Sequence, residues 1–286
     1  MTPEANLGTL PRMRRTIHTV HHLPASGGTV LSQAVAAMQD CILLSEVHPD
    51  RKFWAPYNPI VQITRGYRLL SEAETKALDD LFLKDIAFIH RAAMERGMQL
   101  VVRDHAFIDF MAQNRLYSRL VAVLREEFSV NSLVTTRDPI DVWISCSLNG
   151  WLGDLNPETF CFRYRKMLEH FAGVPRLTYE DFVADPTATL QKICRIFDLR
   201  FAPNFQQRMA HIRHITGNSG RRAPQIAPRP RQWDKLARDA ARAFLASEQY
   251  SLLCQETGYV PITENDVARC GQQPPAPAEV ADGGLG

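Results

Sequence analysis

The sequence predicts an α/β fold in three layers, with a central parallel sheet of about five strands flanked by helices on both faces. Short apolar runs rich in β-branched residues alternate with longer stretches in which apolar residues recur at helical spacing. A strand, a helix and a second strand in succession form a right-handed βαβ unit, which builds a parallel sheet. Polar residues and glycines follow several of the strand-like runs. Such sheets bind ligands beyond the carboxyl ends of their strands, so these residues are the candidates for function.

The bulk composition is that of a globular protein and excludes several function classes. Of the 286 residues, 45% are hydrophobic and 22% are charged, which is ordinary for a chain with a packed core. The net charge of +2 comes without a long basic stripe, so we expect no nucleic-acid partner. Apolar runs fall short of the roughly 18–20 residues of a membrane span, and no signal-peptide pattern follows Arg12, Arg14 and Arg15. We therefore expect a cytoplasmic protein without a membrane partner.

The cysteines show neither CxxC nor Cys/His metal spacing, and most have apolar neighbours, so we predict reduced core cysteines and no metal. The six cysteines are Cys41, Cys146, Cys161, Cys194, Cys254 and Cys270. Composition divides the chain into a flexible lead over residues 1–15, a single domain over 16–260 and a tail over 261–286. The tail is rich in Pro, Gly and Ala and is predicted to be disordered.

The first predicted elements are a strand, a Gly-rich turn, a helix and a second strand. Thr16–Leu23 is short and β-rich, as a first strand should be. The apolar positions after the turn recur at helical spacing, at Val30, Leu31, Ala34, Val35 and Met38. Cys41–Leu44 is a short apolar run typical of a buried strand, and it ends in Ser45 and Glu46.

The middle of the chain continues the alternation. The region His48–Arg68 holds four aromatic residues and three prolines, which predicts an irregular segment or a substrate lid. Ser71–Glu74 is a capping box that opens a long helix ending near Gly97. Gln99–Arg103 is the predicted third strand, and Asn114–Glu127 is predicted to be helical.

The last predicted elements complete the sheet. Leu133–Thr136 is the fourth strand, followed by a helix over Ile140–Leu148. Arg176–Tyr179 is the fifth strand, and Asp185 and Pro186 open a helix with one apolar face. The stretch from residue 208 to residue 235 is basic.

A Gly-rich turn joins the first strand to its helix and resembles part of a phosphate-binding loop. A helix N-terminus offers unpaired N–H groups and a partial positive charge, glycines let an anion approach the backbone, and hydroxyls donate to it. The candidate anion-binding residues are Ala25, Ser26, Gly27, Gly28, Thr29 and Val30. The motif GxxxxGK[ST] is absent, which disfavours Mg-ATP. The turn is therefore P-loop-like without the nucleotide triphosphatase lysine, and a plain glycine turn is the alternative.

Three later strand ends or loops carry further candidates. Arg137 follows the fourth strand, and Ser145 comes eight residues later on the next helix, a pair that suits a phosphate. Tyr179 ends the fifth strand, where its ring can stack on a base. A Gly-hinged basic loop contains Ser219, Gly220, Arg221 and Arg222. An Arg–Asp structural pair and a solvated basic loop are the alternatives.

Together and in this order, these features resemble the sulfotransferase family, whose members use 3′-phosphoadenosine 5′-phosphosulfate (PAPS). The family pattern has a 5′-phosphosulfate loop, an Arg-x-Pro-x-Asp…Ser motif, a Tyr-Glu-Asp-x-x-x-Asp-Pro stretch and a late basic Gly loop. The resemblance runs from about Thr16 to Arg231, and Arg137–Asp141 with Ser145 and the stretch YEDFVADP are its most specific parts.

The resemblance implies roles for the candidates. The loop would hold the 5′-phosphosulfate, while Arg137, Ser145 and either Arg221 or Arg222 would hold the 3′-phosphate, with Tyr179 near the adenine. By this resemblance, the reaction would be an in-line transfer of a sulfuryl group to a hydroxyl or amine, with 3′,5′-diphosphoadenosine (PAP) as product and no metal.

Two residues are candidates for the general base that removes the acceptor proton. His105 matches the position of the histidine in the Lys-Thr-His stretch of cytosolic members, and Glu46 lies where carbohydrate and protein-tyrosine members place a glutamate. We favour His105, since a histidine is near-neutral at pH 7 without tuning, whereas a glutamate needs burial. A hinge histidine held by Asp104 or Asp109, and a Glu46 ion pair with Arg103 or Arg51, are the structural alternatives. His21, His22 and His48 are expected to be structural.

One departure from the family pattern bears on the chemistry. Many members carry Lys or Arg just before the Ser-Gly pair, where this chain has Ala25. Either another cation substitutes, with Arg103 and Arg65 as candidates, or the loop amides and Ser26 suffice, or the protein binds nucleotide and does little chemistry.

Three functions therefore stay open: an active sulfotransferase, a non-catalytic PAP- or PAPS-binding protein that acts through a partner, and a kinase with a degenerate P-loop. The aromatic residues between 53 and 67 suggest a small-molecule acceptor that contains a ring. A homodimer is compatible with the sequence, which does not decide the oligomeric state.

Overall fold

The computed structural model describes residues 15–50, 72–113, 115–217 and 226–271. The chain divides into two compact units, one formed by Met1–Arg137 and Met167–Pro228 and the other by Asp138–Lys166 and Arg229–Gly286. The sequence predicted one domain over residues 16–260. That division stays a prediction. The second of the two compact units combines two stretches that are far apart in the sequence, and no local pattern shows that they share a core.

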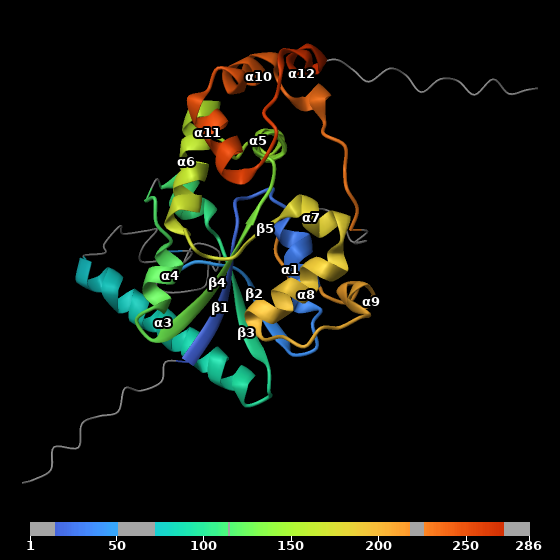
Figure 1. Cartoon of the computed structure of the whole chain (residues 1–286). Coiled ribbons are helices and arrows are strands. Elements are labelled where there is room, and N and C mark those ends of the chain that lie inside the picture. Colours follow the sequence, from blue (N-terminus) through green and yellow to red (C-terminus); the bar gives the residue numbers. More distant parts are fainter. Residues whose placement is uncertain (1–14, 51–71, 114, 218–225, 272–286) are drawn as a thin grey trace, which may run out of the picture. The chain divides into compact units, whose positions relative to one another are not determined.

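The first unit is built on a five-stranded parallel sheet in the order β2-β3-β1-β4-β5 (Figure 1). The strands are β1 (Arg15–His21), β2 (Cys41–Val47), β3 (Gln99–Asp104), β4 (Phe128–Thr136) and β5 (Arg176–Thr178). β1 pairs with β3 on one side, where His18 lies opposite Val101, and with β4 on the other, where Ile17 lies opposite Val130. The chain leaves β1 toward β2 and later returns to β4, so the strand order reverses beside β1. Ligands bind at such a switch point.

Four helices cover one face of this sheet, and their apolar sides form one core cluster with it (Figure 1). They are α1 (Gly28–Ala36), α7 (Tyr179–Ala184), α8 (Pro186–Phe197) and α9 (Phe205–Met209). Val20 and Val101 of the sheet pack in this cluster with Phe182 and Ile193. α8 begins as predicted, because Asp185 accepts a hydrogen bond from the Ala188 amide and Pro186 occupies the first turn.

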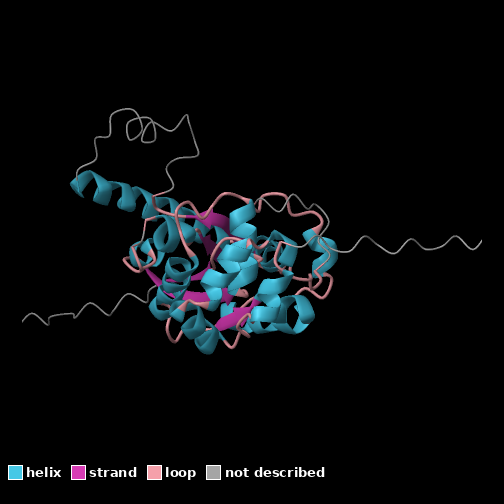
Figure 2. Ribbon diagram, turned by 90° about the horizontal axis from the view of Figure 1, so that it is seen from above, coloured by secondary structure: helices cyan, strands magenta, loops and turns pink. Residues whose placement is uncertain are grey.

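The other face of the sheet is covered by α3 (Glu72–Met94) and α4 (Arg119–Leu124). Ile17, Leu100 and Phe128 point to this side, because successive residues of a strand alternate between the two faces. The long α3 helix projects past the edge of the sheet (Figures 1 and 2). A π-helix, η1 (Ile108–Ala112), follows β3. The alternation explains why both faces of the sheet need helices.

The second unit has its own aromatic core. Its elements are α5 (Pro139–Leu148), most of α6 (Pro157–His170), η2 (Trp233–Lys235), α10 (Arg238–Leu245), α11 (Glu248–Thr257) and α12 (Glu264–Arg269). The Trp143 ring meets those of Phe160 and Phe244 edge-on at 5.4 and 5.3 Å between centroids. Arg231 forms ion pairs with Asp138 at 2.5 Å and with Asp141 at 3.1 Å. This unit is therefore stabilised by apolar burial and by a salt-bridge cluster of its own.

Several predicted boundaries are corrected by the structure. The helix expected over 114–127 is confined to α4, because η1 and a turn precede it. The tail expected to be disordered from residue 261 contains α12, with Val267 and Cys270 buried. The six cysteines are buried and free, as predicted. No helix within the described residues is long and apolar enough to cross a membrane.

Candidate functional site

The predicted anion-binding loop connects β1 to α1 and has the geometry of an anion-binding turn. Ala25 and Gly27 have left-handed backbones, with φ of 63° and 77°. α1 begins at Gly28, and its N-cap residue Gly27 supplies no side-chain hydrogen bond. The amides of the first helical turn have no intrahelical acceptor, and left-handed residues turn neighbouring amides toward one concavity. The loop therefore fits an anion such as a phosphate.

The two glycines of the loop make room for protein side chains. A Cβ atom on Gly27 would lie 2.1 Å from the Tyr179 ring, and one on Gly28 would lie 2.0 Å from the His22 ring. The sequence predicted that these glycines allow an anion to approach. In the structure, the rings of Tyr179 and His22 occupy the space that side chains at these two positions would need, and they pack directly on the loop.

Ser26 differs from the expected hydroxyl donor. Its side chain is 2% exposed, and its Oγ has no hydrogen-bond partner among the described residues. Together with Thr135, whose Oγ1 is also buried and unpartnered in the described part of the chain, it lines a cavity of about 10 Å³. That volume is close to the space of one water molecule. The Ser26 hydroxyl therefore faces the interior, and the amides and Thr29 are the donors that the loop presents outward.

Thr29 and Val30 lie in the first turn of α1. The Thr29 hydroxyl donates to the carbonyl oxygen of Thr216 at 3.5 Å, while half-buried Val30 packs against the core cluster. Val30 therefore offers its backbone amide to an anion.

Arg137 and Tyr179 meet at the loop. Arg137 Nη1 donates to the carbonyl oxygen of Ala25 at 2.9 Å, and its guanidinium carbon lies 4.7 Å from the centre of the Tyr179 ring. Asp138 is the N-cap of α5 and forms an ion pair with Arg231. The Arg–Asp pair at the start of α5 therefore involves Arg231. Ser145 is half-buried on α5 in the second unit. Tyr179 opens α7 and does not end β5 as predicted.

The two candidate bases lie near each other. His105 follows β3, and its Nδ1 is 3.7 Å from Glu46 Oε1. Glu46 lies within β2, at a register shift between Leu44 and Val47, with a left-handed φ of 54°. A left-handed glutamate costs backbone energy and occurs where surrounding contacts hold it. Here Thr216 Oγ1 donates to Glu46 Oε2 at 2.6 Å, and the Arg103 guanidinium pairs with Oε1 at 3.3 Å.

Arg103 links these parts and is only 3% exposed. Its Nε donates to His22 Nε2 at 2.9 Å, and its Nη1 donates to Ser45 Oγ at 3.2 Å and to the Thr216 carbonyl at 2.8 Å. Burial, with the Arg103 charge as the second cause, lowers the pKa of His22 to about 3. Sequence reasoning named the Arg103–Glu46 pair as an alternative but missed Thr216 and the contact with His22.

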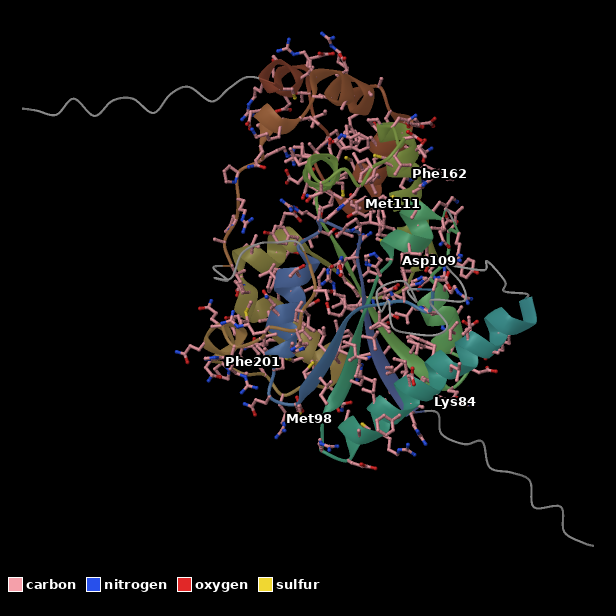
Figure 3. All side chains as sticks on the ribbon, turned by 180° about the vertical axis from the view of Figure 1, so that it is seen from behind. Lys84, Met98, Asp109, Met111, Phe162 and Phe201 are labelled. Carbon is pink, nitrogen blue, oxygen red and sulfur yellow. The ribbon has the colours of Figure 1, made fainter. Side chains whose placement is uncertain are left out.

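The carboxylates expected to hold His105 bind other groups. Asp104 accepts from His21 Nδ1 at 2.8 Å and from the Ser118 hydroxyl at 3.0 Å. Asp109, labelled in Figure 3, bonds His48 Nε2 at 3.1 Å and Arg115 at 3.0 Å. The His21 and His48 rings are thus engaged by Asp104 and Asp109, and Glu46 is the carboxylate that lies beside His105.

Some of the predicted residues lie outside the described part of the chain, and one cavity lies away from this site. Ser219, Gly220, Arg221, Arg222 and Arg65 fall outside the described residues. A cavity of about 700 Å³ opens at the amino ends of β1 and β3, where Thr16, His90 and Gln99 line it. None of the predicted site residues lines this cavity, and ligands of parallel sheets bind at the opposite ends of the strands. Within the described ranges, no three His, Cys, Asp or Glu side chains are grouped to hold a metal ion.

Comparison with solved structures identifies the fold. The structure is similar to the sulfotransferase domain from the curacin biosynthetic pathway, with a TM-score of 0.54 and 14% identity over 88% of this chain and 100% of that one. A sulfotransferase domain of the Synechococcus PCC 7002 olefin synthase has a TM-score of 0.49 and 14% identity, over 91% and 94% of the two chains. Mouse SULT7A1 complexed with PAP has a TM-score of 0.49 and 12% identity, over 87% and 90%. No family model and no curated protein matches the chain. The chain therefore has the sulfotransferase fold.

Proposed function

We propose that this chain, which has the fold of sulfotransferase domains, transfers a sulfuryl group from PAPS to a hydroxyl or amine of a small acceptor. One observation supports the proposal most directly. An anion-binding loop, two arginines and a His–Glu pair lie at the carboxyl ends of β1, β2, β3 and β4. An acceptor with a ring remains the proposed class, and a cytoplasmic location and a homodimer remain proposals of the same kind.

The described residues fit a nucleotide that carries one phosphate at the 5′ position and one at the 3′ position of its ribose. The first-turn amides of α1 and the Thr29 hydroxyl would hold the 5′ end, because they surround the positive end of the helix. Arg137 would hold the 3′-phosphate, and Tyr179 would lie near the adenine. Bound PAPS supplies the sulfuryl group and, as its leaving group, the 5′-phosphate of PAP.

His105 acts as the general base in this proposal. Its Nδ1 faces Glu46, so Nε2 is the atom that takes the proton from the acceptor hydroxyl. Glu46 stabilises the imidazolium that results, since a carboxylate near a histidine favours its charged form. Glu46 is also bonded by Arg103 and Thr216, which fixes its carboxylate beside the ring. The two candidates thus take different roles, with His105 as base and Glu46 as its partner.

Nucleotide selectivity tests the proposal. We expect PAP to raise the melting temperature strongly, and 5′-AMP and Mg-ATP to raise it little, because only PAP fills both phosphate positions. A ligand at a hundred times its dissociation constant stabilises the folded state by about 2.7 kcal/mol, which a thermal-shift assay detects. A larger shift with Mg-ATP would favour the kinase, and no shift with PAP would refute the proposal.

His105→Ala separates the sulfotransferase from a non-catalytic nucleotide-binding protein. We expect PAP release from PAPS, measured with ring-containing hydroxyl acceptors, to fall about 10²–10⁴-fold, which is the contribution of a general base. The PAP dissociation constant should stay the same, because His105 is not assigned to either phosphate. Unchanged turnover in the variant would remove His105 from the mechanism, and the absence of turnover in the unmutated protein would favour the non-catalytic alternative.

A further inference from the structure

A short segment that follows α9 contacts both the anion-binding loop and the candidate base pair. We call residues 216–217 the strap. The two apolar side chains that precede it, Ile212 and Ile215, pack against the core cluster that contains α1. Thr216 is exposed, yet its amide, its carbonyl and its hydroxyl each have a hydrogen-bond partner in the protein. An exposed residue can bond to solvent instead, so these contacts indicate that the strap has one defined position.

The strap rests on the first turn of α1. The Thr216 carbonyl oxygen accepts a hydrogen bond from the Thr29 hydroxyl at 3.5 Å. A Cβ atom on Gly217 would lie 2.1 Å from Thr29 Oγ1, and the φ of Gly217 is 140°, a backbone conformation that residues with side chains rarely adopt. Glycine is therefore required where the strap crosses the end of the helix that is proposed to bind the donor.

The side chain of Thr216 reaches the base pair from this position. Its hydroxyl donates to Glu46 Oε2 at 2.6 Å and lies 2.9 Å from Ser45 Oγ, which also accepts the Thr216 amide at 3.1 Å. An ionised carboxylate only accepts hydrogen bonds, so the Thr216 hydroxyl proton points to Glu46 and the Ser45 hydroxyl donates to Thr216 Oγ1. The hydrogen bonds therefore run in one direction toward Glu46, and each strengthens the next.

Glu46 needs such an anchor because its backbone is strained. It has a left-handed φ of 54° at the register shift of β2, a conformation that costs about 1–3 kcal/mol and persists where its surroundings hold it. Arg103 pairs with Oε1, the oxygen that lies 3.7 Å from His105 Nδ1. Thr216 holds the other oxygen, Oε2. With both oxygens held, the carboxylate keeps Oε1 turned toward His105.

We propose that Thr216 is a positioning residue that holds Glu46 beside the base His105 and ties this pair to the end of α1 where the donor binds. The inference rests on the proposed function and deepens it. Thr216 acts through Glu46 and not on the reacting atoms. Gly217 contributes by seating the strap on Thr29.

A mutant cycle read on the His105 ring tests this positioning without turnover. Protein with labelled histidines is titrated by NMR, and His105→Ala identifies the His105 signal among the nine histidines. We expect Glu46→Gln to lower the midpoint of the His105 titration by about one pH unit, since a nearby carboxylate favours the charged ring. In a Thr216→Val background the same change should lower it by less than half as much, because the carboxylate has already left its place. Arg103 and His22, the other charged or titratable groups near this ring, are present in all four proteins. Equal shifts in both backgrounds would overturn the proposal.

Turnover with ring-containing hydroxyl acceptors gives a second readout. Thr216→Val should lower kcat about tenfold, the lower end of what a hydrogen bond to a charged group contributes. It should leave the PAP dissociation constant within about twofold, because the Thr216 carbonyl that meets Thr29 is retained. The loss should vanish in a Glu46→Gln background, and Thr216→Ser, which keeps the hydroxyl, should retain most of kcat. Additive losses with Glu46→Gln, or equal losses in the valine and serine variants, would contradict the proposal.

Two further variants complete the test. Thr187→Val changes an exposed threonine in the first turn of α8 and should leave both readouts unchanged. Gly217→Ala should lower kcat as Thr216→Val does, because the added methyl group displaces the strap from Thr29, and an unaffected Gly217→Ala variant would separate Thr216 from the end of α1. If the unmutated protein neither binds PAP nor turns over PAPS, the proposed function fails, whereas the His105 titrations still decide whether Thr216 positions Glu46.

Discussion

His22 makes the stability of the fold depend on pH in a predictable direction. Burial and the nearby Arg103 charge lower its pKa from 6.5 to about 3 in the folded protein. Between these values the unfolded chain binds a proton that the folded chain does not, so the stability is present at neutral pH and is lost as the pH falls below about 6.5. The slope reaches about 1.4 kcal/mol per pH unit for one proton.

A comparison of urea denaturation between pH 7 and pH 5 isolates this contribution. His22→Gln cannot be protonated, so its free energy of unfolding should fall less steeply with acidification than that of the unmutated protein. Other histidines with lowered pKa values, His18 and His170, are present in both proteins and cancel in the difference. Parallel curves would mean that the His22 ring is protonated as easily in the folded chain as in the unfolded one.

The same residue shows what sequence can reveal at this scale. The loop, Arg137, Glu46 and His105 were all proposed from the sequence, because each follows an apolar run and carries an interpretable side chain. The bond between His22 and Arg103 was not predicted, since it joins the residue after β1 to β3 and depends on the space above Gly28. A glycine pair alone does not show whether it serves a ligand or a neighbouring ring.

At the scale of elements, prediction succeeded where local patterns decide and failed where long-range contacts do. All five strands were predicted, because short apolar runs flanked by polar residues need no knowledge of their partners. α6, α10 and α11 were not predicted. The residues of α6 are mostly polar, and its buried side chains, such as Cys161 and Tyr164, belong to a core completed by distant parts of the chain.

The register shift in β2 is a second feature at this scale that the sequence did not predict. The predicted strand stopped at Leu44, but β2 continues to Val47 through a left-handed Glu46. Such a break in the ladder redirects a side chain, and here it accompanies the approach of Glu46 to His105. No sequence signal marks it, since left-handed backbones favour Gly, Asn and Asp over Glu.

At the scale of the whole molecule, the second unit is discontinuous in the sequence. Residues 138–166 supply Trp143, Phe160 and Tyr164, and the stretch from residue 229 supplies Phe244 and Tyr250. Neither stretch can bury these rings alone. Phe244 is fully buried and lies edge-on to both Trp143 and Tyr250, at 5.3 and 5.2 Å between ring centroids.

We therefore expect a chain that ends at Pro228 to lose the folded second unit, although residues 138–166 remain. Each large aromatic side chain removed from a core costs about 3–5 kcal/mol, and a whole domain is stable by about 5–15 kcal/mol. Loss of Phe244 and Tyr250 together exceeds the stability that residues 138–166 can lose and stay folded.

The readouts are the tryptophan emission maximum, which should shift to longer wavelength as Trp143 becomes exposed, and the thermal melt. A chain that ends at Gly271 keeps every described residue and should melt like the full chain, and Phe244→Ala should lose about 3–5 kcal/mol by itself. A chain ending at Pro228 with a buried Trp143 would show that residues 138–166 fold without the distant stretch.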